Sequence, residues 1–124
     1  MGDDKRITFI GYTKAPLQYL QLSDVLISSA LAEGLPNTVL EALLCGLPCI
    51  LSDIDPHLEI VKDTKLECIF NRHSVDGLSS LIQESILWDL NERSKYAREL
   101  AYRKFGIIRL ANDYEQVYNQ LLMK

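Results

Sequence analysis

Residues 25–52, VLISSALAEGLPNTVLEALLCGLPCILS, contain two short apolar runs separated by a loop and the signals of a helix. The runs at residues 25–28 and 49–52 are continuous rather than alternating, which is typical of parallel strands buried on both faces. Between them, Pro36 suits the first turn of a helix and Gly46 suits the left-handed residue that closes one. A strand, a helix and a second strand form the basic unit of an α/β fold.

The segments around this unit continue the alternation of strands and helices. We predict further strands at residues 7–11 and 67–70, short helices at residues 16–22 and 58–62, and a central helix over residues 36–45. The fold class is therefore α/β, with a doubly wound, Rossmann-like parallel sheet of about four strands and flanking helices.

The C-terminal third is predicted to be all helical. Ser74 can cap a helix that runs to about Ile86, and a polar helix follows it through Leu100. The last segment carries an apolar stripe at steps of three and four residues, which needs a surface beneath it. Most such stripes simply cover their own core. No repeat or linker divides the chain, so residues 1–124 are interpreted as one unit.

Glu33 and Glu41 lie eight positions apart across the turn that starts the central helix. Helical side chains lean toward the helix N-terminus, so Glu41 is predicted to point back to the N-terminal end of the helix, which Glu33 borders. That end of the helix also offers unpaired backbone N–H groups and the positive end of the helix dipole. Two carboxylates for hydroxyl groups beside amides for phosphate are what a sugar nucleotide requires. The plainer alternative is a pair of solvated residues that favour the dipole.

Composition limits the classes of function. A chain of 124 residues with 48% hydrophobic content can form one globular domain, which is small for an enzyme of two substrates. A net charge of −4, without a basic stripe, argues against a nucleic-acid partner. No apolar run approaches a membrane span and the start lacks a signal peptide, so a cytoplasmic location is expected.

The cysteines and histidines form no chemical motif. Cys45, Cys49 and Cys68 are odd in number and lack a second ligand pair, so we interpret them as free, buried thiols of a reducing compartment. His57 and His73 have no partner at the spacing of a metal site or a triad and are predicted to be surface residues. No metal site is predicted.

Several motifs in order resemble one family. They are Ile7-x-Phe9-x-Gly11, Ser23 to Ser29, Glu33-Gly34-Leu35-Pro36-Asn37 through Glu41-Ala42, and Cys45-Gly46-Leu47-Pro48. Together they resemble the retaining GT-B glycosyltransferases, the large group with glycogen synthases, sucrose synthases and bacterial polysaccharide and lipid-linked sugar transferases. The likeness runs from about residue 7 to residue 122. It implies that residues 1–124 are part of a C-terminal, donor-binding domain, half of a GT-B fold.

The resemblance assigns roles to individual residues. It implies that Glu33 binds the donor sugar near the anomeric carbon and is the residue closest to catalysis, and that Glu41 holds the ribose hydroxyls. Backbone N–H groups near Asn37, Thr38 and Val39, beside Gly34, Leu35 and Pro36, would meet phosphate or sugar, and the loop from Phe9 to Gly11 would border the base. The donor would be a UDP- or GDP-sugar, with no further cofactor. In the family the last helix packs on the N-terminal acceptor domain, which is absent here, and any membrane association would come from that absent part.

Charge indicates that such a site is incomplete. No Lys or Arg lies between Lys14 and Lys62, although a diphosphate beside two carboxylates needs positive charge. The family keeps an Arg and Lys pair in the upstream part of the donor domain, which is missing. The chain by itself is therefore expected to be inactive.

The Asp53-Ile54-Asp55 sequence has two interpretations. It echoes a metal-binding DxD motif, but the favoured reading is a turn whose aspartates cap the helix entered at Pro56. Relatives of the family commonly have a Gly-Gly-like turn here, so contacts from this loop depart from the pattern. One alternative to the leading hypothesis is a receiver-like or protein-interaction module in which Asp53 accepts phosphate. Another keeps the fold but changes the reaction, as in epimerases and phosphorylases.

Overall fold

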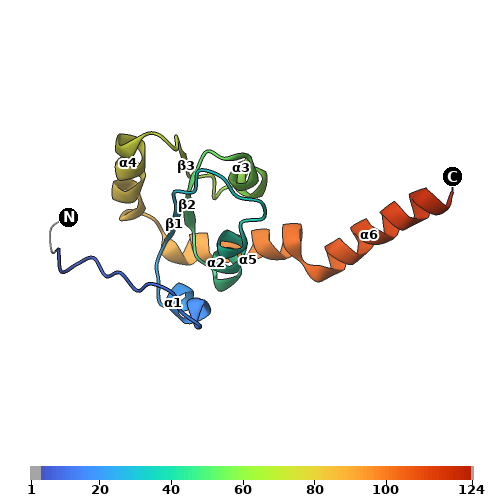
Figure 1. The fold of residues 1–124 in the computed structure, drawn as a ribbon, viewed down its shortest axis with the longest axis horizontal. Helices are drawn as coiled ribbons and strands as arrows, with labels where there is room; N and C mark the ends of the chain where they lie inside the picture. The colour runs from blue at the N-terminus through green and yellow to red at the C-terminus, as the bar shows by residue number, and fades with distance from the viewer. Residues whose placement is uncertain (1–3, 124) are drawn as a thin grey trace.

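The computed structural model describes residues 4–123. Within them, helices and strands alternate up to β3, and three helices follow (Figure 1). The elements are α1 (Pro16–Gln21), β1 (Leu26–Ser28), α2 (Asn37–Cys45), β2 (Cys49–Ser52), α3 (Asp55–Val61), β3 (Ile69–Phe70), α4 (Val75–Ser85), α5 (Leu90–Phe105) and α6 (Ile107–Leu122).

The three strands form one parallel sheet in the order β1-β2-β3, which confirms the α/β class. In the register, Ile27 pairs with Ile50, and Leu51 pairs with Ile69. The central strand β2 is buried at every residue. The prediction of short, continuous apolar strands between helices is therefore correct for these three elements.

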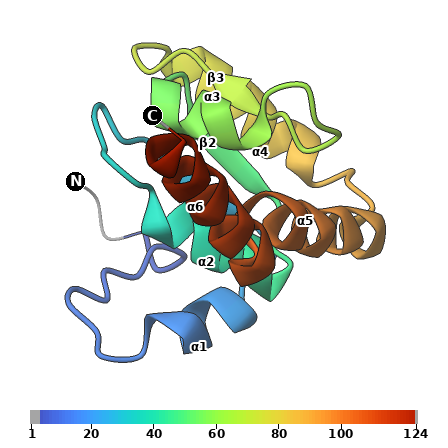
Figure 2. The same cartoon turned by 90° about the vertical axis from the view of Figure 1, so that its right-hand side faces the viewer.

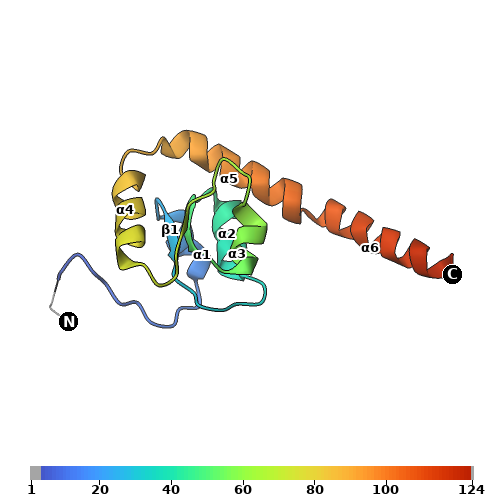
Figure 3. The same cartoon turned by 90° about the horizontal axis from the view of Figure 1, so that it is seen from above.

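Helices cover both faces of the sheet. Cys49 and Leu51 of β2 belong to a core cluster shared with α2 and α5, whereas Ile50 joins a second cluster with Phe70 and residues of α4. Figures 1 and 3 show α4 on one side of the sheet and α2 with α5 on the other. Alternate residues of one strand thus fill two cores, as a doubly wound sheet requires.

Residues 7–11 do not form the strand that the sequence predicts. Among the described residues, their backbone is not paired with any strand, and Phe9 is 85% exposed. A strand exists only when a neighbour accepts its hydrogen bonds, and these residues run clear of the sheet (Figure 1). The outer edge of β1 is unpaired in this part of the chain, and Ile27 on it is 43% exposed.

Most predicted helix boundaries agree with the structure within one or two residues. Ser74 caps α4 by accepting a hydrogen bond from the Gly77 N–H, as predicted. There are two exceptions. The helix α3 begins at Asp55 rather than at residue 58, because Pro56 fits its first turn, and α5 continues to Phe105 beyond the predicted Leu100. The earlier start of α3 changes which side chains it buries.

The predicted free thiols are present. Cys45, Cys49 and Cys68 make no disulfide. Burial raises the pKa of the Cys49 thiol to about 12, so it stays neutral inside the core. Cys68 is also buried, whereas Cys45 is only half-buried.

The last helix, α6, projects from the body. It buries none of its residues, and its apolar side chains, such as Tyr114, Tyr118 and Leu121, are exposed. Figures 1 and 3 show it continuing outward beyond α5, and Figure 2 looks along it toward the body. Its stripe therefore does not cover its own core. Of the helices within residues 4–123, none combines the length and apolar character needed to cross a membrane.

Gly46 ends α2 in the left-handed conformation that the sequence predicts, with φ of 83°. The Leu47 N–H donates to the Ala42 carbonyl at 2.8 Å and the Gly46 N–H to the Leu43 carbonyl at 2.9 Å, which is the Schellman arrangement. A Cβ at Gly46 would also meet the side chain of Ser94 on α5. The turn that feeds β2 thus depends on a glycine.

We expect Gly46→Ala to lower the free energy of unfolding by about 2 kcal/mol, because alanine disfavours positive φ and its methyl group would meet Ser94. Urea denaturation followed by circular dichroism measures this change. Gly34→Ala is the matched control: nothing lies near a Cβ at that position, and its effect should stay below about 1 kcal/mol. Equal effects of the two substitutions would contradict this account of the turn.

Candidate functional site

The loops that follow the three parallel strands meet at the carboxyl edge of the sheet. In open α/β sheets this edge is where ligands bind. Glu33 lies in the loop between β1 and α2, Asp53 follows β2, and Arg72 follows β3. Of these three, Glu33 is a predicted site residue, and it lies at the edge that suits a ligand.

Glu33 presents a partly exposed carboxylate at this edge. Its side chain is 34% exposed, and its Oε2 lies 3.5 Å from Nε2 of His57. The Ser28 hydroxyl, at the end of β1, is also 3.5 Å from the same nitrogen. Glu33 is therefore accessible to a ligand on one side and faces a buried imidazole on the other.

His57 is completely buried, so its prediction as a surface residue is wrong. Because α3 begins at Asp55, His57 falls in its first turn and turns inward with Ile60 and Val61. Its Nδ1 lies 3.0 Å from the Ser52 carbonyl oxygen and 3.2 Å from the Ser52 hydroxyl. The spacing of 57, 60 and 61 is that of an apolar helix face, and it would have indicated burial had the helix start been placed correctly.

The first turn of α2 offers fewer free amides than predicted. The Asn37 N–H donates to the Leu35 carbonyl at 2.9 Å, and the Val39 N–H donates to the Pro36 carbonyl at 3.0 Å. Among the hydrogen bonds that the described residues make, none uses the Thr38 N–H, which is thus the amide of these three left for a ligand. Gly34 and Leu35 are exposed beside this turn, while Pro36 and Val39 are buried and shape it from below.

Glu41 lies in the second turn of α2 and is half-buried. Its carboxylate makes no hydrogen bond or ion pair with the other described residues, so its oxygens remain accessible as acceptors. Gly11, the remaining predicted site residue, lies in the exposed N-terminal segment with φ of 70°, and no heavy atom lies within 4 Å of the position of a Cβ. Gly11 is therefore not packed into the site.

Comparison with known proteins decides the family. Residues 2–103 match the family described as glycosyl transferases group 1. The chain belongs to the group 1 glycosyltransferases. The parallel sheet with helices on both faces fits part of the GT-B architecture of such enzymes.

Curated relatives of this glycosyltransferase chain are longer proteins. It is 28% identical over 124 residues to the UDP-Gal:alpha-D-GlcNAc-diphosphoundecaprenol alpha-1,3-galactosyltransferase of Escherichia coli, covering 99% of this chain and 32% of that protein. It is 27% identical to the N-acetyl-alpha-D-glucosaminyl L-malate synthase of Bacillus anthracis, covering 96% and 32%. A Salmonella typhimurium lipopolysaccharide 1,6-galactosyltransferase is 40% identical over 58 residues, covering 43% and 16%. The chain thus spans about a third of the length of the first two relatives.

Asp53 joins the ends of β2 and β3 instead of capping α3. Its Oδ1 accepts hydrogen bonds from the backbone N–H and from Nε of Arg72, both at 2.9 Å, and Nη2 of Arg72 donates to the Asp53 carbonyl at 2.6 Å. The cap position of α3 belongs to Ile54, so the predicted capping role of the aspartates is wrong. Within residues 4–123 no three His, Cys, Asp or Glu side chains are grouped to share a metal ion.

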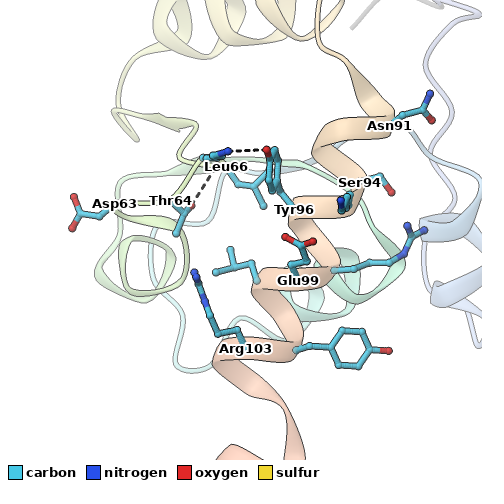
Figure 4. Close-up of a pocket in the computed structure, with 13 residues that line it drawn as sticks. Asp63, Thr64, Leu66, Asn91, Ser94, Tyr96, Glu99 and Arg103 are labelled. Atoms are coloured by element: carbon cyan, nitrogen blue, oxygen red, sulfur yellow. Dashed lines mark hydrogen bonds between the residues drawn. The ribbon is translucent and has the colours of Figure 1, made fainter.

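A large hollow lies away from the candidate site. It has a volume of about 1100 Å³ and is lined by residues 63–66 and one side of α5 (Figure 4). Those residues precede β3, so the hollow is at the amino end of that strand. Two residues of its lining are joined by a hydrogen bond, which Lys65 donates to the Tyr96 hydroxyl at 2.7 Å. Its size alone therefore does not make it the ligand site of a parallel sheet.

The contacts with Arg72 make the contribution of Asp53 to stability dependent on pH. They hold the pKa of Asp53 below its usual range, chiefly through the hydrogen bond from the Arg72 backbone N–H. Because the pKa is depressed in the folded state, this contribution to stability is present at neutral pH and is lost as pH falls below about 4. We expect Asp53→Asn to be less stable than the wild type at neutral pH, with the difference shrinking in acid. Urea denaturation across pH measures both curves, and a difference that stays constant down to low pH would contradict the prediction.

Proposed function

We propose that this chain binds the nucleotide-sugar donor, a UDP- or GDP-sugar, for a retaining glycosyltransferase that transfers a hexose to a saccharide or lipid-linked acceptor. The observation that supports the proposal is the accessible carboxylate of Glu33 in the loop before α2, with Glu41 in the second turn of that helix, in a chain of the group 1 family. The names of relatives support the chemistry: one uses UDP-Gal and a diphosphoundecaprenol sugar, and another acts on lipopolysaccharide.

The proposed roles follow from the chemistry of each group. Ionised carboxylates accept hydrogen bonds from paired hydroxyls, so Glu33 would hold the hexose and Glu41 the ribose. The Thr38 N–H, with the positive end of the α2 dipole, would meet phosphate or sugar oxygens. Gly34 and Leu35 would line the approach, and the loop with Gly11 would border the base.

The rate of transfer would come from positioning and charge rather than from a simple acid or base. As the bond to the anomeric carbon breaks, negative charge develops on the departing nucleoside diphosphate and positive charge on the sugar. Glu33, near the anomeric carbon, suits the positive side of that transition state. The proposal requires no metal ion, because backbone dipoles and cationic side chains can receive the charge on the diphosphate.

Exposed apolar surfaces support a larger assembly around this chain. The stripe on α6 is uncovered, and so are Ile7, Phe9 and Ile10 near the N-terminus. Contiguous exposed apolar side chains mark surfaces that other parts of a protein or a partner cover. We propose that α6 packs on an acceptor-binding domain, which agrees with the coverage of about a third of the length of the relatives.

The competing hypotheses fit the structure less well. A receiver-like module would need an Asp53 open to phosphorylation, but this carboxylate is occupied by Arg72. A sugar-nucleotide epimerase or phosphorylase would share the architecture. Relatives that align over nearly the whole chain are named for synthesis or transfer, which favours transfer here.

An amide NMR titration of the 124-residue chain with UDP, UDP-glucose, GDP-mannose and inorganic phosphate tests donor binding. We expect saturable shifts centred on residues 34–40 with one nucleotide, and weaker shifts with phosphate alone. Glu41→Ala should weaken that binding roughly tenfold or more, because a hydrogen bond to a charged group contributes about 1.5–3 kcal/mol.

Glu115→Ala, which removes an exposed carboxylate on α6, is the matched control and should leave the shifts unchanged. Shifts of equal size in wild type and Glu41→Ala would contradict the assigned ribose contact. Shifts that are absent for every nucleotide, both here and in a longer protein with its upstream part, would overturn donor binding.

A further inference from the structure

We propose that His57 is a positioning residue for Glu33: Ser52 fixes the ring through Nδ1, and the ring holds the Glu33 carboxylate in place through Nε2. This inference rests on the proposed function, since it concerns how the donor-binding carboxylate is oriented. The observation behind it is a completely buried imidazole that bridges the ends of β1 and β2 and the loop with Glu33.

The hydrogen bonds around Ser52 determine which ring nitrogen carries hydrogen. The Ser52 hydroxyl donates to the Ala30 carbonyl oxygen at 2.6 Å, so its own hydrogen is already used. Toward His57 it can then only accept, as the Ser52 carbonyl oxygen also does. Both partners of Nδ1 are acceptors, and Nδ1 therefore carries a hydrogen.

The opposite nitrogen faces the candidate site. Nε2 lies 3.5 Å from both the Glu33 carboxylate and the Ser28 hydroxyl. With hydrogen fixed on Nδ1, the contact between Nε2 and Oε2 of Glu33 is attractive only when a hydrogen lies between them. The proposed contact therefore requires a second ring hydrogen, on Nε2, which the ring donates to Glu33 as groups behind a ligand-binding side chain commonly do.

The same serine and histidine organise the loop between β1 and α2. Leu31 and Leu35 in this loop are exposed and give it little apolar anchorage. The polar tethers are the Ser52 hydroxyl on the Ala30 carbonyl and the His57 ring on Glu33. The end of β2 therefore sets the position of the loop at two points, one of which is the carboxylate proposed to bind the sugar.

Spectra of the ring nitrogens test the contact without any ligand. In the free 124-residue chain we expect ¹⁵N spectra to show hydrogen on both Nδ1 and Nε2 of His57. Glu33→Ala should shift the Nε2 resonance, whereas Glu41→Ala should leave it unchanged. An Nδ1 or Nε2 without hydrogen, or an Nε2 resonance that Glu33→Ala does not move, would overturn the inference whatever the nucleotides do. Glu33 is on a surface loop, so this substitution leaves the core intact.

Substitutions of His57 test its effect on the donor. Asn places an amide near Nδ1 and keeps the Ser52 contact, whereas Gln reaches the place of Nε2. We expect His57→Asn to weaken the binding of the nucleotide sugar roughly two- to tenfold, because the Glu33 side chain would no longer be ordered before binding. His57→Gln should retain more of the affinity.

A double-mutant cycle with Glu33→Ala separates positioning from a general loss of structure. If His57 acts through Glu33, His57→Asn should cost nothing further in affinity once Glu33 is alanine. An equal loss in both backgrounds would overturn the positioning role. If the wild-type chain binds no nucleotide sugar, donor binding by this chain fails, while the ring spectra still decide the contact between His57 and Glu33.

Discussion

The rest of the structure depends on the complete burial of β2. Its four residues lie between β1 and β3, with α2 and α5 on one face of the sheet and α4 on the other. A strand buried in this way must satisfy its backbone groups through both neighbours, and it therefore fixes the parallel register of β1 and β3. Its last residue, Ser52, bonds to Ala30 and His57, so the position of β2 also determines where these two residues lie in the site. The candidate site is thus an extension of the hydrogen bonding of the sheet.

Local signals made the central unit predictable from sequence. Gly46 and Pro36 mark the two ends of α2, because glycine is the usual residue at positive φ after a helix and proline, which lacks an N–H, suits a helix start. The apolar runs of β1 and β2 have the composition of buried strands. Residues 7–11 have the same kind of composition but form no strand. Composition shows that a segment could form a strand if a neighbouring strand were available. Whether it pairs depends on a strand that is distant in the sequence, which the composition of one segment does not reveal.

The site was only partly predictable for a related reason. Glu33 and Glu41 could be picked out because they flank a recognisable helix start. The importance of His57 could not, since its burial follows from the exact start of α3 and its partners come from Ser28, Ser52 and Glu33. The occupied amides of Asn37 and Val39 show the same limit: a helix start predicts free donors on average, but the local turn decides which remain.

The balance of charge decides what this surface can hold by itself. A diphosphate placed beside Glu33 and Glu41 meets two carboxylates, and each like-charge contact at 4 Å costs about 1 kcal/mol even in water and more in a closed site. Arg72 lies at the end of β3, yet its guanidinium bonds to Asp53, and withdrawing it would leave that carboxylate uncompensated. The hydrogen that the proposed contact places between His57 and Glu33 would add little, because it would lie on the buried side of the carboxylate. Hydroxyl groups are therefore better matched to Glu33 and Glu41 than phosphates are, and a nucleoside diphosphate would bind tightly beside them only if cationic side chains also reach it.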